Sequence, residues 1–223
     1  MLVENKRQDV LNYVTYGTQN KSYGETIQRD TTPSGIVYGE VLNSEYFYDM
    51  VHCGYDSGGI CGYIGLGLLI SYKEKYKTGN YMDDVYWYDS SRTGLLGGTQ
   101  SLARYLRSLG SSNDTMSTSI KKVSEDYFEN RGVNVTHTSI LLFFTKNKII
   151  ECIDEDNPVL LFGSFENPDN GESINHAVTV YSYWDAEGDT LFTAHFGWDT
   201  EEPSTRYSRI YVYGLRGSMY VLE

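Results

Sequence analysis

The feature that most constrains this chain is an apolar run from Cys61 to Tyr72 that leaves almost no polar face. Ile64, Leu68 and Tyr72 follow helical spacing, so the run predicts a helix. A helix that is apolar on nearly every side must be enclosed by other parts of a protein. The run is too short to span a bilayer. We therefore expect a buried central helix and no membrane span.

The patterns around this run separate along the chain. Helical periodicity predicts helices over 99–109, 113–131 and 145–153. Alternating or compact apolar patterns predict strands over 133–136, 159–162, 174–184, 190–196, 207–213 and 219–222. Because helices dominate the first half and strands the second, the sequence favours an α+β fold over an alternating βαβ sheet.

The chain divides into an extension and one domain. Residues 1–44 are polar and turn-rich, and we interpret them as an N-terminal extension, either an arm, a linker or a remnant of a propeptide. Residues 45–223 form the predicted domain, with a helical part over about 45–131 and a β part over about 132–223.

Composition limits the partners. The chain has 223 residues and a formal net charge of −12, from 18 Lys and Arg against 30 Asp and Glu. Nucleic acid is an unfavourable partner, because its phosphates select Lys and Arg, and so is an anionic membrane surface. The same charge predicts a preference for neutral or basic substrates.

The composition also bears on location. The chain is acidic and contains 21 Tyr, a combination that we associate with extracellular proteins. Met1 runs directly into charged residues without an apolar signal segment. We expect a secreted or extracellular protein whose signal segment lies outside this sequence, with a cytoplasmic protein as the alternative.

Cys61 is the candidate nucleophile. The residues before it, 54–60, read Gly-Tyr-Asp-Ser-Gly-Gly-Ile, so a glycine-rich loop leads into the first turn of the buried helix. Unpaired N–H groups and the helix dipole favour a thiolate there, which predicts a lowered pKa. Glycines at 62, 65 and 67 weaken the helix by about 1 kcal/mol each, which indicates close approach of other backbone. The alternative is that Cys61 is only a small buried apolar residue.

Two of the four histidines are placed to act with a cysteine. His176 and His195 lie on the two arms of a predicted hairpin that turns near residue 187. We expect them to face each other with Cβ atoms about 4.5–5.5 Å apart, so that one imidazole orients the other as in a catalytic triad. Trp198 would shield the pair from water. Taken singly, each histidine fits a surface or hydrogen-bonded core position better than a catalytic one.

These motifs together resemble the papain-like cysteine peptidases, most closely the bacterial streptopain-like and C39-like branches. The resemblance covers about residues 50–222 and rests on Gly-Gly-Ile-Cys61-Gly, Asn-His176-Ala-Val-Thr-Val and His195-Phe-Gly-Trp198. It implies a two-lobe fold in which a central cysteine-bearing helix in a helical lobe faces an antiparallel β-lobe. Cys61 matches the nucleophile, His176 the general base, His195 the orienting residue and Trp198 the tryptophan that follows it.

The sequence departs from the family pattern at two places. The family usually has Asn or Asp where this chain has His195. It also places a Gln five or six residues before the cysteine, where this chain has Asp56 and Tyr55. Because an ionised Asp cannot donate a hydrogen bond, we expect Tyr55 and the backbone N–H of Cys61 to hold the oxyanion.

The implied activity is hydrolysis of peptide bonds through a Cys61 acyl-enzyme, with His176 as general acid and base and a peptide or protein as substrate. It requires no cofactor. No metal is expected, because the His and Cys residues lack zinc-site spacing. The alternatives are a related Cys–His acyl-transfer enzyme, transglutaminase-like or amide-cleaving, and a non-catalytic binding module. Cys53 and Cys152 form either a disulfide or two buried thiols.

Overall fold

Helices and strands separate along the chain as the sequence predicts. In a computed structural model, the described residues form an α+β fold with five α-helices and a seven-stranded antiparallel sheet. The structure describes residues 36–55, 59–110, 116–141, 146–168, 170–186, 189–200, 205–211 and 217–223.

The helices begin and end where local chemistry favours it. Ser101 caps α4 by accepting a hydrogen bond from the Arg104 N–H at 3.1 Å. Gly132 ends α5 in the left-handed conformation, with a φ of 65°. The helix predicted from residue 99 begins only at Leu102, because a 3₁₀ turn precedes it. The helical elements are α2 (Glu45–Asp49), α3 (Cys61–Tyr76), η2 (Asp84–Tyr86), η3 (Gly98–Gln100), α4 (Leu102–Leu109), α5 (Ser117–Arg131) and α6 (Lys146–Asp154).

The strands form one sheet in the order β2-β7-β3-β4-β5-β6, and β1 also pairs with β4. All of these pairs are antiparallel. The strand predicted over 133–136 begins instead at His137. The strands are β1 (Ile36–Glu40), β2 (His137–Leu141), β3 (Val159–Glu166), β4 (Ser173–Ala186), β5 (Asp189–His195), β6 (Ser208–Tyr211) and β7 (Ser218–Leu222).

Part of the predicted N-terminal extension belongs to the sheet. Residues 36–40 form β1, and Val37 pairs with Asp185 of β4. Val41 is buried, and the Leu42 N–H donates to Asp156 at 2.7 Å. Residues 36–42 therefore pack with the domain, and the predicted boundary at residue 44 is not a boundary of the sheet. Residues 1–35 lie outside the described residues.

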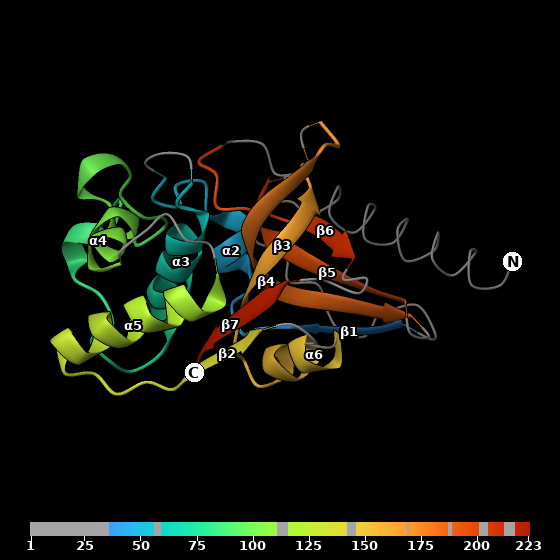
Figure 1. Cartoon of the computed structure of the whole chain (residues 1–223), viewed down its shortest axis with the longest axis horizontal. Helices are drawn as coiled ribbons and strands as arrows, with labels where there is room; N and C mark the ends of the chain where they lie inside the picture. Colours follow the sequence, from blue (N-terminus) through green and yellow to red (C-terminus); the bar gives the residue numbers. More distant parts are fainter. Residues whose placement is uncertain are drawn as a thin grey trace, which may run out of the picture.

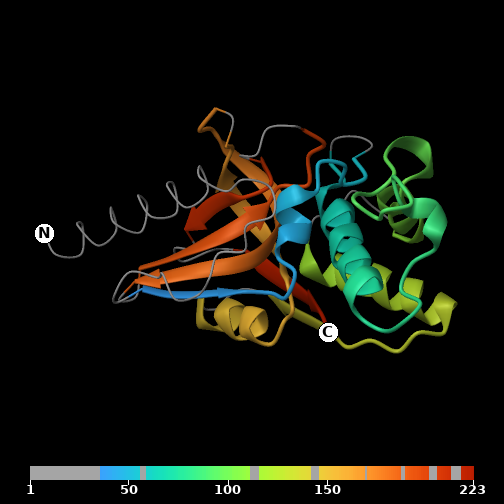
Figure 2. The same ribbon diagram turned by 180° about the vertical axis from the view of Figure 1, so that it is seen from behind.

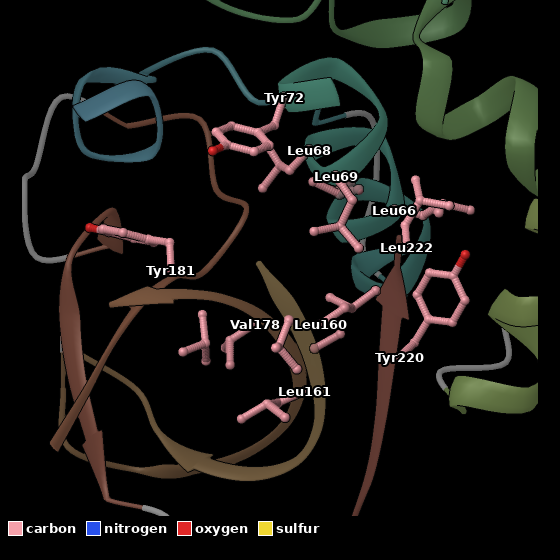
Figure 3. Packing of buried hydrophobic residues seen from close by; sticks show 14 of the residues in the cluster. Leu66, Leu68, Leu69, Tyr72, Leu160, Leu161, Val178, Tyr181, Tyr220 and Leu222 are labelled. Atoms are coloured by element: carbon pink, nitrogen blue, oxygen red, sulfur yellow. The ribbon is translucent and has the colours of Figure 1, made fainter. Parts of the chain in front are cut away.

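Helix α3 occupies the centre of the molecule, as its apolar sequence predicts. Figures 1 and 2 show it between the helices α4 and α5 on one side and the sheet on the other. Its Leu66 and Leu69 belong to the same buried cluster as Leu160 and Val178 of the sheet (Figure 3). No helix in the described part of the chain is long and apolar enough to cross a membrane.

The glycines of α3 allow the helix to approach β3. A Cβ atom at Gly65 would overlap Cδ1 of Leu160, and one at Gly62 would lie 3.0 Å from the Phe162 ring. The expected close approach of backbone is therefore wrong at these two positions, because the space of each missing Cβ is taken by neighbouring side chains. A Cβ at Gly67 would make only ordinary contacts of 3.7 Å or more.

Candidate active site

Cys61 is the first residue of α3, at the end of the helix that carries unpaired donors. The N–H groups of Tyr63 and Ile64 bond to the carbonyl of Ile60 at 2.9 and 3.0 Å. Those of Cys61 and Gly62 precede the first helical bonds, so the helix itself offers them no acceptor. Both face the Cys61 sulfur. They are therefore available to an anion that forms beside it.

The sulfur also faces the N–H of Ala177, which places it against β4 at the residue after His176. Burial raises the pKa of the Cys61 thiol above its ordinary value, although the three N–H groups oppose this effect. The prediction of a lowered pKa is therefore wrong, because desolvation outweighs the helix start. Cys61 is a thiol at neutral pH and needs a base to become a nucleophile.

His176 is a neutral imidazole with a fixed tautomer. Its Nε2 lies 2.7 Å from the carbonyl oxygen of Phe196, and because a carbonyl only accepts, Nε2 carries the proton and Nδ1 the lone pair. Burial lowers the pKa of His176. Among the described residues, Nδ1 has no hydrogen-bond partner, and no hydrogen bond joins His176 to Cys61. The imidazole is thus ready to accept a proton at Nδ1.

Aromatic rings cover His176. The ring of Phe196 lies 5.5 Å from it and nearly parallel, and the ring of Trp198 lies 5.2 Å away. Trp198 therefore contacts the imidazole of His176, but the histidine pair that it was predicted to shield does not form. Gly197, between the two, has a φ of 74°, and a Cβ there would lie 2.9 Å from Ile64 of α3. Glycine lets this turn pack directly on the helix that carries Cys61.

The hairpin register does not bring the two histidines together. Thr179 is opposite His195, and His176 pairs instead with Gly163 of β3. Ala186 pairs with Asp189, and a bulge between Val180 and Ser182 moves the partner of His195 by only one residue, to Thr179. The predicted facing pair is therefore wrong by three residues along β4.

His195 has a different role from the one predicted. It is fully buried, with Nε2 at 3.0 Å from the Met50 carbonyl, while the Gly197 N–H donates to Nδ1 at 2.8 Å. Burial lowers the pKa of His195 to about 4. Because both ring nitrogens bond to backbone, the prediction that His195 orients His176 is wrong. The Phe196 carbonyl orients His176, and His195 fixes the turn that supplies it.

Tyr55 lies on the loop before Cys61. Its side chain is 40% exposed, and its carbonyl accepts a hydrogen bond from the Gly98 N–H at 3.1 Å. Residues 56–58, which include Asp56, lie outside the described residues. The use of the Tyr55 hydroxyl as an oxyanion donor stays a prediction.

Asp199 is a site residue that the sequence analysis missed. Its Oδ1 accepts hydrogen bonds from the Cys53 N–H at 2.8 Å and from the Cys53 thiol at 2.9 Å. Its Oδ2 lies 3.8 Å from Nδ1 of His52, whose ring stacks on Tyr88. The available signal was its position, since an acidic residue directly follows Trp198 of the motif.

Cys152 and His137 take no part in this site. All three cysteines are free, so Cys53 and Cys152 are buried thiols rather than a disulfide. His137 opens β2 and lies 2.9 Å from the Tyr220 hydroxyl. Within the described ranges, no cluster of His, Cys, Asp and Glu could hold a metal ion.

No protein-family model matches this chain, and no curated protein sequence matches it. The function must therefore be inferred from the geometry around Cys61 and His176 and from the motifs that they belong to.

Proposed function

We propose that this protein is a papain-like cysteine peptidase that hydrolyses peptide bonds through a Cys61 acyl-enzyme. The observation that carries the proposal is the placement of the Cys61 sulfur. It lies at the start of the buried central helix and faces the N–H of Ala177 in β4. Ala177 directly follows His176 in the sequence, and the Phe196 carbonyl fixes the tautomer of His176.

The arrangement of the elements supports the same proposal. The cysteine-bearing helix α3 lies between other helices and an antiparallel sheet, and the histidine lies on that sheet (Figure 1). This is the relation between two lobes that the family resemblance implies. The cover provided by Trp198 over His176 fits the family motif as well.

The chemistry follows from a neutral pair. Nδ1 of His176 takes the thiol proton as the Cys61 sulfur attacks the carbonyl carbon of a peptide bond. The carbonyl oxygen becomes an oxyanion near the N–H groups of Cys61 and Gly62, and such donors are typically worth about 2.7–4 kcal/mol each. The imidazolium then protonates the leaving amine, which departs as the C–N bond breaks.

Deacylation reverses these roles. His176 removes a proton from a water molecule, whose oxygen attacks the thioester carbon. The C–S bond breaks, the proton returns to the Cys61 sulfur, and the carboxylic acid product leaves. If an amine replaces water, the same steps give acyl transfer, so the transglutaminase-like alternative shares this site.

A non-catalytic binding module is the second candidate. It is favoured by the raised pKa of the Cys61 thiol and by the lack of a hydrogen bond between Cys61 and His176 in the described residues. In that case the site would bind a peptide without cleaving it.

The test combines turnover and labelling. Wild-type protein is incubated with an unfolded protein substrate and, separately, with a peptide epoxide, and the labelled residue is located by mass spectrometry. We expect cleavage and labelling of Cys61, with both lost in Cys61→Ala and cleavage lost in His176→Ala. Cys152→Ala is the matched control and should keep both, because Cys152 lies on α6 away from the site.

The other outcomes separate the candidates. Amine incorporation without cleavage would indicate the acyl-transfer enzyme. Peptide binding that survives in Cys61→Ala, with no turnover or labelling in the wild type, would indicate the binding module and contradict the peptidase.

A further inference from the structure

The short segment 196–199 contacts both His176 and the loop that precedes Cys61. The Phe196 carbonyl fixes His176, Trp198 covers its ring, and Asp199 follows directly. The Asp199 side chain extends in the other direction, to the loop that leads to Cys61.

Three donors from that loop converge on a single carboxylate oxygen. Oδ1 of Asp199 accepts from the Cys53 N–H at 2.8 Å, from the Cys53 thiol at 2.9 Å and from the Tyr55 N–H at 3.4 Å. A carboxylate suits this position because it only accepts hydrogen bonds. The loop therefore has its path set by Asp199 shortly before the chain reaches Cys61.

The loop is held from its other side as well. The Gly98 N–H donates to the Tyr55 carbonyl at 3.1 Å, and the Leu95 N–H donates to the His52 carbonyl at 2.7 Å. A Cβ at Gly97 would lie 2.8 Å from the Tyr55 carbonyl. With these contacts in place, loss of the Asp199 hydrogen bonds would release Cys53 and Tyr55 from the segment that holds His176.

We infer that Asp199 is a positioning residue, which aligns the loop before Cys61 with the turn that holds His176. The inference rests on the proposed function, because it assigns Asp199 a role in pairing that nucleophile with that base. Asp199 acts through Cys53, Tyr55 and the turn rather than by contact with a substrate.

The thiol of Cys53 contributes one of the hydrogen bonds to Asp199. Burial and the charge of Asp199 raise the pKa of Cys53 well above its ordinary value. Cys53 therefore stays protonated and donates to the carboxylate. Cys53→Ser keeps a donor at this position, whereas Cys53→Ala removes it and leaves the backbone contacts.

The experiment measures how strongly His176 accelerates alkylation of Cys61. Iodoacetamide labelling at pH 7 is followed at the Cys61 peptide in wild type, His176→Ala, Asp199→Ala and the double variant. We expect the wild type to be alkylated about tenfold faster than His176→Ala. Asp199→Ala should be alkylated less than about twofold faster than the double variant, because a misplacement of 1 Å can reduce such catalysis by about 10²-fold. In hydrolysis, kcat should fall and KM should change little.

Matched variants separate positioning from folding. Asp199→Asn keeps an accepting oxygen and should retain most of the acceleration. Asp185→Ala removes a carboxylate that accepts from Thr190 near the far end of β4, and it should leave the acceleration unchanged. If Asp199→Ala does not fold, Cys53→Ala replaces it and should give an intermediate loss that Cys53→Ser restores.

Two results would overturn the inference, and they differ. Equal acceleration by His176 in wild type and in folded Asp199→Ala would exclude positioning by Asp199 while leaving the peptidase proposal intact. No acceleration and no hydrolysis in the wild type would refute both proposals, because no Cys–His pair would exist to align.

Discussion

At the residue scale, Cys61 and His176 have pKa values displaced in opposite directions from the usual ones. Burial raises the pKa of the Cys61 thiol and lowers the pKa of the His176 imidazole. The resting pair is thus thiol and neutral imidazole across the whole range between them. A preformed thiolate–imidazolium pair would require the reverse order of pKa values.

The first prediction concerns the pH dependence of this pair. Hydrolysis should rise as His176 loses its proton, with a midpoint below pH 6.5. The thiolate absorbance of Cys61, measured as the difference between wild type and Cys61→Ser, should appear only above pH 9. A thiolate signal that is already complete at pH 6 would show that the pair is ionised at rest.

The second prediction concerns stability and His195. Its pKa is about 4 in the folded protein, below the ordinary value near 6.5, so the unfolded chain binds more protons between these values. Stability from neutral His195 is therefore full above pH 6.5 and is lost as the pH falls through about 4, by about 3 kcal/mol. Urea unfolding at pH 7, 5 and 4 should show this loss in wild type and not in His195→Gln. Equal losses in both proteins would mean that His195 is not the group responsible.

Sequence identified the side chains of this site better than their partners. Cys61, His176 and Trp198 stand in motifs that side-chain chemistry explains. The group that orients His176 is the backbone carbonyl of Phe196. Because every residue has a backbone carbonyl, the residue types do not show which one has this role. The predicted role of His195 depended on a hairpin register, and pairing that begins at Ala186 and Asp189 sets Thr179 rather than His176 opposite His195.

At the element scale, the packing of α3 on β3 depends on Gly62 and Gly65, which have no side chain between the helix and the strand. Leu160 occupies the space where a Cβ of Gly65 would lie, whereas Gly67 has room. The helix can therefore approach the sheet closely, and the glycine that allows this lowers the stability of the helix itself.

The third prediction compares Gly65 with Gly67. Gly65→Ala should destabilise the fold by about 1–3 kcal/mol through overpacking against Leu160, despite a gain in helix propensity. Gly67→Ala is the matched control, and it should be neutral or stabilising by up to about 1 kcal/mol. Urea unfolding at pH 7 measures both. Equal stability of the two variants would show that α3 can move away from β3 at little expense.

The elements themselves were predicted where periodicity is strong. The strands β3, β4, β5 and β7 and the helices α5 and α6 lie close to their predicted ranges. Strand β1 was missed because residues 36–40 carry no clear pattern of their own, and their conformation comes from pairing with β4. Such pairing joins residues far apart in the chain, which local periodicity cannot reveal.

At the scale of the whole molecule, the charge of −12 surrounds a site whose own machinery is neutral at rest. Two acidic residues are also exposed where β3 leads into β4, since Glu166 ends β3 and Glu172 directly precedes β4, the strand that carries His176. The net charge of the protein and the charge of this local surface thus have the same sign, and under the proposed function both would favour cationic substrates.

The fourth prediction follows from this field. For a Lys-rich peptide, kcat/KM should fall by about threefold to tenfold as ionic strength rises from about 0.01 to 0.15 M, because the screening length shortens from about 30 to about 8 Å. A Glu-rich peptide with the same cleavage sequence should show a rise, and an uncharged one no change. The effect should lie in kcat/KM rather than in kcat, since salt weakens the encounter and leaves the neutral Cys61–His176 pair untouched. Identical salt responses for the three peptides would mean that local contacts, rather than net charge, select the substrate.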